Sequence, residues 1–225
     1  MPQTERKKHR PLIARIAYAL IWLYIRLVYR PKVACLKPER KKQGYGGGNI
    51  IIANHTNHKD ALLFIIALSG MKPYTIVAKD WYEKGLLGKI MGGNRCIPAD
   101  RFGLDTGWIR ESAAILRAGG NILLFPEGHT EKTEEMEPYK SGFLMLAAMS
   151  GARIVTAHHD RVYRAFRAQH ILLDEPAALT LPPADMTAEN LEKEAEAFRR
   201  RTLFLEECKK KKTGAHPVPQ GAEKS

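Results

Sequence analysis

From residue 49 onward, short apolar runs alternate with longer segments in which apolar residues recur at helical spacing. The short runs are apolar at consecutive positions, which is typical of strands covered by helices on both faces. We predict strands near residues 49–53, 74–78, 121–125, 153–157 and 170–173. We predict helices near residues 60–68, 105–118, 141–149 and 187–207. This alternation predicts an α/β domain whose mixed, mostly parallel sheet is covered by helices.

The strongest helical pattern precedes this domain, at residues 12–29. One side of that helix is apolar, and Arg15 and Arg26 lie on the other side. The arginines are separated by about 15 Å of helix, against roughly 30 Å of bilayer hydrocarbon. We therefore predict an amphipathic helix that lies in the membrane interface with its arginines at the headgroups. The alternatives are that the helix packs on the domain, or that it spans the membrane once with its arginines snorkelling to the headgroups.

Positive charge is concentrated at the two ends of the chain. The net charge is +12, of which residues 1–42 contribute +10 and residues 199–225 contribute +5, so the stretch between them carries −3. Basic ends beside an apolar helix suit an anionic membrane surface. A nucleic-acid enzyme more often spreads basic residues over its folded face, so we expect no nucleic-acid partner.

These patterns divide the chain into three parts. We predict a basic membrane-interface helix at 1–36, an α/β domain at 37–208 and a basic, disordered tail at 209–225. The three cysteines are far apart and show neither a disulfide framework nor a metal spacing, which fits a reducing cytosol. We therefore expect the protein to be held peripherally at the cytoplasmic face of the cell membrane.

The most informative segment joins the strand at 49–53 to the helix at 60–68. It carries His55 and Asp60, which diverge on one continuous helix but can converge at a strand–helix turn. A carboxylate on one ring nitrogen fixes the imidazole tautomer and leaves the other nitrogen free to remove a proton. Alternatively, Asn57 and Asp60 form a variant of the capping box, and both interpretations can hold together. His58 lies three residues from His55, but without a third ligand nearby we expect no metal.

The chain resembles the glycerolipid acyltransferases, the family of 1-acylglycerol-3-phosphate acyltransferases, in several blocks that occur in the family's order. Asn54-His55 followed by Asp60 matches the N-H-x-x-x-x-D motif. Residues 125–128 (FPEG) match the third block. Residues 93–101 (GNRCIPADR), 139–143 (YKSGF) and 154–157 (IVTA) resemble the second block, the lysine-glycine segment and the fourth block. The family expects threonine and arginine after Gly128 and proline in the fourth block, where this chain has His129, Thr130 and Thr156.

The resemblance implies specific roles for the residues in these blocks. His55 would act as the base and Asp60 would orient it, Arg101 would bind the acceptor's phosphate, and Glu127 and Gly128 would contact the acceptor's glycerol or phosphate. Lys140 is our candidate to replace some of the charge lost with the missing arginine. The departures from the family pattern surround the acceptor site, so they bear on the acceptor more than on the reaction type.

The expected reaction is transfer of a fatty acyl group to the hydroxyl of lysophosphatidate or a related lysolipid. The donor would be acyl-CoA or acyl carrier protein as co-substrate, with no further cofactor. No G-x-S-x-G elbow occurs, so the acceptor hydroxyl would attack the thioester directly. Backbone N–H groups near the junction are candidate oxyanion donors. The alternatives are a different acceptor, such as an ornithine lipid, or a non-catalytic lipid-binding homologue.

Overall fold

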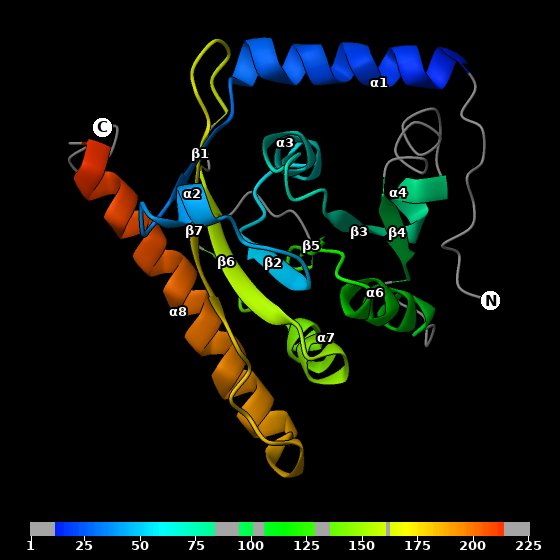
Figure 1. Cartoon of the computed structure of the whole chain (residues 1–225), viewed down its shortest axis with the longest axis vertical. Helices are drawn as coiled ribbons and strands as arrows, with labels where there is room; N and C mark the ends of the chain where they lie inside the picture. The colour runs from blue at the N-terminus through cyan, green and yellow to red at the C-terminus, as the bar shows by residue number, and fades with distance from the viewer. Residues whose placement is uncertain (1–11, 84–94, 101–105, 129–135, 161–162, 214–225) are drawn as a thin grey trace, which may run out of the picture.

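The structure is a computed structural model that describes residues 12–83, 95–100, 106–128, 136–160 and 163–213 (Figure 1). Within these residues, seven strands form one sheet in the order β1-β7-β6-β2-β5-β3-β4. The strands are β1 (Lys32–Cys35), β2 (Asn49–Ala53), β3 (Tyr74–Ala78), β4 (Cys96–Ala99), β5 (Ile122–Leu124), β6 (Arg153–His159) and β7 (His170–Ala177).

Strand β2 lies in the middle of the sheet, and all of its residues are buried. It pairs in parallel with β5 on one side and with β6 on the other. Side chains alternate between the faces of a strand, so Ile50 and Ile52 enter one hydrophobic core while Ile51 and Ala53 enter the other. The apolar residues at positions 50–53 are therefore what a central parallel strand requires.

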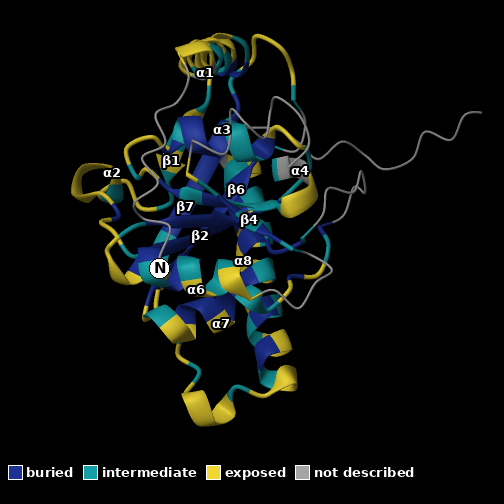
Figure 2. Ribbon diagram, turned by 90° about the vertical axis from the view of Figure 1, so that its right-hand side faces the viewer, coloured by how far each residue is buried: buried dark blue, intermediate teal, exposed yellow. Residues whose placement is uncertain are grey.

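Helices cover both faces of this sheet. The core that contains Ile50 and Ile52 is closed by α6 (Gly107–Arg117), α7 (Gly142–Ser150) and α8 (Ala188–Thr213). The core that contains Ile51 is closed by α3 (Asp60–Ala67) and by η2 (Ile25–Tyr29), a π-helical turn that follows α1 (Leu12–Tyr24). The remaining elements are α2 (Arg40–Gln43), α4 (Lys79–Glu83) and the 3-10 turn η3 (Pro183–Asp185). Figure 2 shows the buried strands between the two helical layers.

The sheet is mixed because β7 runs antiparallel to β6, while the other pairs of neighbouring strands are parallel. The predicted fold class, an α/β domain with a mostly parallel sheet covered by helices, is thus confirmed. Two strands lie outside the predicted set, β1 and β4. Both are edge strands, and Pro98 fits into β4 because an edge strand leaves one row of N–H groups unpaired.

The structure shifts the expected boundaries of the three parts. Strand β1 pairs with β7, so the sheet already begins at Lys32, within the segment that we assigned to the N-terminal helix. At the other end, α8 continues to Thr213, so residues 209–213 are helical rather than part of a disordered tail. The expected tail beyond them, 214–225, lies outside the described residues. The predicted helix at 12–29 changes from α to π geometry at Ile25 and ends at Arg30, whose φ is 45°.

Helix α1 presents its apolar stripe away from the domain. The exposed fractions of Ile13, Ile16, Leu20, Leu23 and Leu27 are 76%, 52%, 61%, 47% and 60%. The following turn is anchored through Ile25 and Tyr29, which are 2% and 5% exposed, and Ile21 of α1 packs partly against the same core. The described part of the domain therefore leaves the apolar stripe exposed. No helix in the described part of the chain combines the length and the apolar character that crossing a bilayer requires.

Candidate active site

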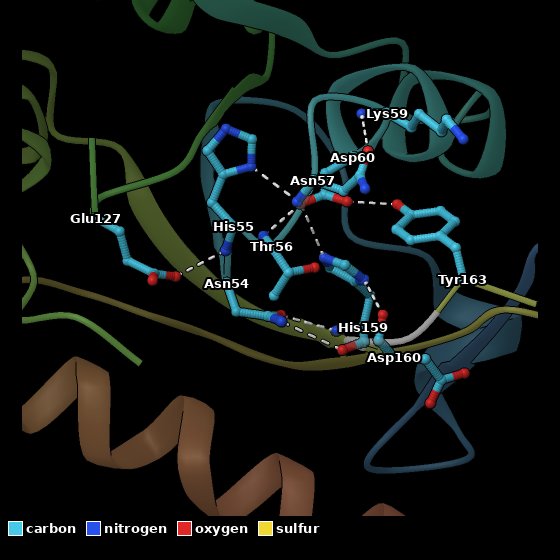
Figure 3. Close-up of polar contacts among 10 residues, drawn as sticks. All are labelled: Asn54, His55, Thr56, Asn57, Lys59, Asp60, Glu127, His159, Asp160 and Tyr163. Carbon is cyan, nitrogen blue, oxygen red and sulfur yellow. Dashed lines mark hydrogen bonds and ion pairs between the residues drawn. The ribbon is translucent and has the colours of Figure 1, made fainter. Parts of the chain in front are cut away.

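The connection from β2 to α3 lies at the carboxyl ends of parallel strands, where α/β proteins collect their functional residues. Residues 54–59 leave the end of β2, and Asp60 begins α3. The segment after β5 brings Phe125 and Glu127 to the same edge of the sheet, and the end of β6 brings His159. Figure 3 shows how the side chains of Asp60, Glu127 and His159 lie around His55.

The carboxylate of Asp60 is the centre of this site, and its side chain is 0% exposed. Its Oδ2 atom accepts a hydrogen bond from His55 Nδ1 at 3.0 Å, and from the backbone N–H groups of Thr56 at 2.7 Å and Asn57 at 2.8 Å. The turn at 56–60 therefore folds around a charged oxygen. The prediction that His55 and Asp60 converge at the strand–helix turn is confirmed.

Two residues from the distant β6–β7 region also contact Asp60. The hydroxyl of Tyr163 donates to Oδ1, and Nε2 of His159 lies 3.3 Å from Oδ2. His159 donates from its other nitrogen, Nδ1, to the carbonyl oxygen of Asp160 at 2.6 Å. Neither contact was predicted from the sequence. The available signal was a pair of histidines at the carboxyl end of a strand that could neighbour β2.

These donors keep Asp60 ionised. Burial by itself raises the pKa of the Asp60 carboxyl group, but the hydrogen bonds from His159 and His55 outweigh burial and bring the pKa well below its ordinary value of 3.8. Tyr163 shows the reciprocal effect, since burial and the charge of Asp60 raise the pKa of its phenol. The phenol therefore stays protonated and donates.

The His55 ring is oriented for proton transfer. Because Asp60 is ionised, Nδ1 of His55 carries the proton that it donates to Oδ2, and Nε2 is left as the basic nitrogen. Nε2 points away from Asp60 (Figure 3). The ring stacks on Phe125 with centroids 4.2 Å apart, and the side chain is 17% exposed. It is thus held on two sides but not sealed in the core.

The capping interpretation of Asn57 holds in part. Its backbone N–H donates to the side chain of Asp60, as in a capping box, but its own side-chain oxygen accepts from the backbone N–H of Lys59 at 3.1 Å. Asp60 therefore serves both the turn and the His55 ring, and the two interpretations are compatible.

Two further polar side chains fix the end of β2. The amide of Asn54 donates to the carbonyl oxygen of His159 at 3.2 Å and accepts from the N–H of His159 at 2.9 Å, which ties β2 to β6. The carboxylate of Glu127, 5% exposed, accepts from the N–H of His55 at 2.7 Å and from the N–H of Glu137 at 3.3 Å. Glu127 thus ties the third motif to the first, and its predicted contact with the acceptor stays a prediction.

The N–H groups that we considered as oxyanion donors are engaged elsewhere. The N–H of His55 donates to Glu127, and those of Thr56 and Asn57 donate to Asp60. These three N–H groups therefore already have carboxylate partners, and the assignment of oxyanion donors near the junction stays a prediction.

Gly128 and Lys140, both predicted to bind the acceptor, lie against each other. Gly128 has a φ of +80°, and a Cβ at this position would lie only 2.8 Å from Lys140 Nζ. Glycine therefore satisfies both the backbone conformation and the close approach of the amine. Lys140 is exposed, and its N–H donates to the carbonyl oxygen of Pro126 at 2.9 Å. Arg101 and His129 lie outside the described residues.

The fold and the site define the class of this protein. The family model named Acyltransferase matches residues 32–159, more than half of the chain. The chain belongs to this acyltransferase family.

Two known proteins are similar to the chain. It is 30% identical over 132 residues to a probable 1-acyl-sn-glycerol-3-phosphate acyltransferase of Mycoplasma pneumoniae; the match covers 56% of this chain and 47% of the relative. The chain thus spans about half the length of that curated relative. Its fold is similar to the 1-acyl-sn-glycerophosphate (LPA) acyltransferase PlsC of Thermotoga maritima. The TM-score is 0.59 at 18% identity, with 92% of this chain and 83% of that chain covered.

We predict that Asp60→Asn destabilises the fold more at neutral pH than in acid. Because the folded-state pKa of Asp60 lies well below the ordinary 3.8, ionised Asp60 stabilises the protein above that pH, and this stabilisation declines as the pH falls from there towards the lowered folded-state pKa. A tenfold change in proton affinity corresponds to about 1.4 kcal/mol, so we expect a loss of more than about 1 kcal/mol at pH 7. Urea unfolding of both proteins at pH 7 and pH 3 measures this. A difference that stays constant with pH would contradict the prediction.

Proposed function

We propose that this protein transfers a fatty acyl group from an acyl thioester to the hydroxyl of a lysolipid. The observation that carries the proposal is the oriented imidazole: His55 Nδ1 lies 3.0 Å from the buried carboxylate of Asp60, and Nε2 points away from it. This is the geometry of a general base whose tautomer is fixed by an acid. Membership of the acyltransferase family supports the same reaction.

The proposed reaction needs no covalent enzyme intermediate. Nε2 of His55 takes the proton from the acceptor hydroxyl as its oxygen attacks the thioester carbonyl carbon, and the carbonyl becomes a tetrahedral oxyanion. Asp60 stabilises the imidazolium that forms. The oxyanion then collapses, the carbon–sulfur bond breaks, and the thiolate recovers the proton from Nε2. The products are the acylated lipid and the free thiol of CoA or acyl carrier protein.

For the acceptor we propose lysophosphatidate or a closely related phosphate-bearing lysolipid. The name of the Mycoplasma pneumoniae relative supports this choice. In this chain, the amine of Lys140 over Gly128 supplies positive charge beside the third motif. Arg101 remains our second candidate for the phosphate, as predicted from the sequence. Such cations suit a phosphate because hydrogen bonds between a cation and a phosphate oxygen are stronger than hydrogen bonds between neutral groups.

We further propose that α1 seats the protein on an anionic membrane surface at the cytoplasmic face of the membrane. The apolar stripe of α1 faces away from the domain, and an uncovered stripe of this kind suits the interface between headgroups and acyl chains. The guanidinium of Arg26 lies 5.1 Å from the centre of the Trp22 ring on the same helix. An aromatic ring paired with a cation is typical of side chains at headgroup level.

We expect His55→Ala to lower the rate of acyl transfer by about 10²- to 10⁴-fold, because it removes the general base. The matched control is His58→Ala, an exposed histidine three residues further along, which should retain the wild-type rate. Transfer of a labelled acyl group into lysophosphatidate measures both. An undiminished rate in His55→Ala would overturn the assignment, and vesicle binding without turnover by the wild type would favour a non-catalytic lipid-binding protein.

Lys140→Ala should raise KM for a phosphate-bearing acceptor roughly tenfold with little change in kcat. The reason is that it removes one charged contact, and an exposed contact of this kind contributes a binding free energy at the low end of the range for charged hydrogen bonds. An uncharged acceptor should show no such change. Lys193→Ala, which alters an exposed lysine on α8, is the control. Equal effects on both acceptors would contradict the phosphate assignment and favour an acceptor such as an ornithine lipid.

A charge in the apolar stripe should weaken membrane binding. We expect Leu20→Glu to lower the affinity for anionic vesicles roughly tenfold or more. It replaces an apolar side chain that would be buried in the membrane by a negative charge that anionic lipids repel. Met149→Glu changes a similarly exposed apolar residue on α7, far from α1 (Figure 1), and should bind as the wild type does. Vesicle flotation measures both. Unchanged flotation of Leu20→Glu would refute the proposed seat.

A further inference from the structure

The connection between β6 and β7 exposes an aromatic ring on a strained backbone. Phe166 has a φ of 60°, in the left-handed region that bulky residues rarely adopt, and its side chain is 72% exposed. It is the third residue of a tight turn in which the N–H of Arg167 donates to the carbonyl oxygen of Arg164 at 3.3 Å. Glycine is the residue that suits this position. Since the ring packs so little on its own chain, intramolecular contacts do not account for a phenylalanine here.

This turn is attached to the end of the N-terminal helical segment. The N–H of Phe166 donates to the carbonyl oxygen of Val28 at 2.7 Å, and the N–H of Gln169 donates to that of Tyr29 at 2.8 Å. Figure 1 shows the β6–β7 connection rising beside the end of α1, at the same end of the molecule. The turn that carries the exposed ring is therefore held against the residues that directly follow the apolar stripe of α1. The nearest residue of that stripe in sequence, Leu27, precedes Val28 and is 60% exposed.

The residues around the ring favour one kind of partner. Arg164 and Arg167 flank Phe166 and are exposed, so an apolar ring stands between two cations. A ring that enters the acyl-chain boundary with arginines left at the headgroups is the pattern of a membrane-surface anchor, and cations near an anionic surface add to its affinity.

We propose that the β6–β7 turn, residues 164–167, is a second membrane-inserting element that acts beside α1. Phe166 enters an anionic lipid surface, and Arg164 and Arg167 contact its headgroups. This inference rests on the membrane seat of α1 proposed above. It also links the bilayer to the site, because Tyr163, directly before the turn, donates to Asp60. An inserted turn would hold the His55–Asp60 pair close to the lipid surface from which a lysolipid arrives.

The test is the full-length chain with Phe166→Gly, compared with wild type on vesicles of phosphatidylcholine with and without phosphatidylglycerol. We expect the variant to keep or raise the Tm, because glycine relieves the backbone strain, while its affinity for anionic vesicles falls about tenfold, as loss of one inserted ring predicts. Phe166→Trp, which keeps an aromatic ring, should retain the affinity. Phe204→Ala, which removes an aromatic ring that is 44% exposed on α8, is the matched control and should bind as wild type does.

The outcomes separate this inference from the proposed function. If Leu20→Glu loses vesicle binding and Phe166→Gly does not, the turn is not an anchor and the seat of α1 stands. A fall in Tm for Phe166→Gly with unchanged binding would show a structural role and overturn the inference. The double variant Arg164→Gln, Arg167→Gln should lose most of the preference for phosphatidylglycerol, and an unchanged preference would contradict the headgroup contacts. Acyl transfer to a detergent-dispersed lysolipid by Phe166→Gly should match wild type, because Phe166 makes no contact with the His55–Asp60 pair.

Discussion

The ionised carboxylate of Asp60, buried at the start of α3, is the group on which the site depends. Removing a charge from water costs several kcal/mol unless donors replace the lost hydration. Here those donors are the His55 ring, the N–H groups of the turn after β2 and the Tyr163 hydroxyl, with His159 in ion-pair distance. The donors that stabilise the charge of Asp60 therefore also fix the conformation of the turn, the tautomer of His55 and the position of the end of β6.

The reversal of the sheet at β7 has a direct consequence for this arrangement. Because β7 runs antiparallel to β6, the chain turns back at the carboxyl end of the parallel strands, close to the end of β2. A parallel successor would have carried the chain away through a crossover connection instead. His159 at the end of β6 and Tyr163 in the connection to β7 both reach Asp60, and the same connection lies against η2, so it contacts both the site and the base of the N-terminal helix.

Aromatic and basic side chains continue this link between the helix and the site. The rings of Tyr29 and Tyr163 meet edge to face with centroids 5.2 Å apart, and Lys59 donates to the hydroxyl of Tyr29 at 3.1 Å. Lys59 directly precedes Asp60 in the chain. The proposed membrane seat is therefore connected to the carboxylate through packed, hydrogen-bonded groups, which suits an enzyme whose acceptor would arrive from a lipid surface.

Local pattern alone determined much of this protein. The apolar runs predicted β2, β3, β5, β6 and β7, and the motif spacing indicated that His55 and Asp60 can converge, because burial on both faces and a short strand–helix turn are properties of contiguous residues. The edge strands β1 and β4 were missed, since a short strand on one side of a sheet needs no continuous apolar run. Other contacts could not be predicted from local pattern, because they depend on which strand ends lie side by side. These are the contacts of Asp60 with the β6–β7 region and the hydrogen bond from the N–H of His55 to the carboxylate of Glu127. Strand order is settled by tertiary packing between segments far apart in the chain, and no periodicity within a segment encodes it.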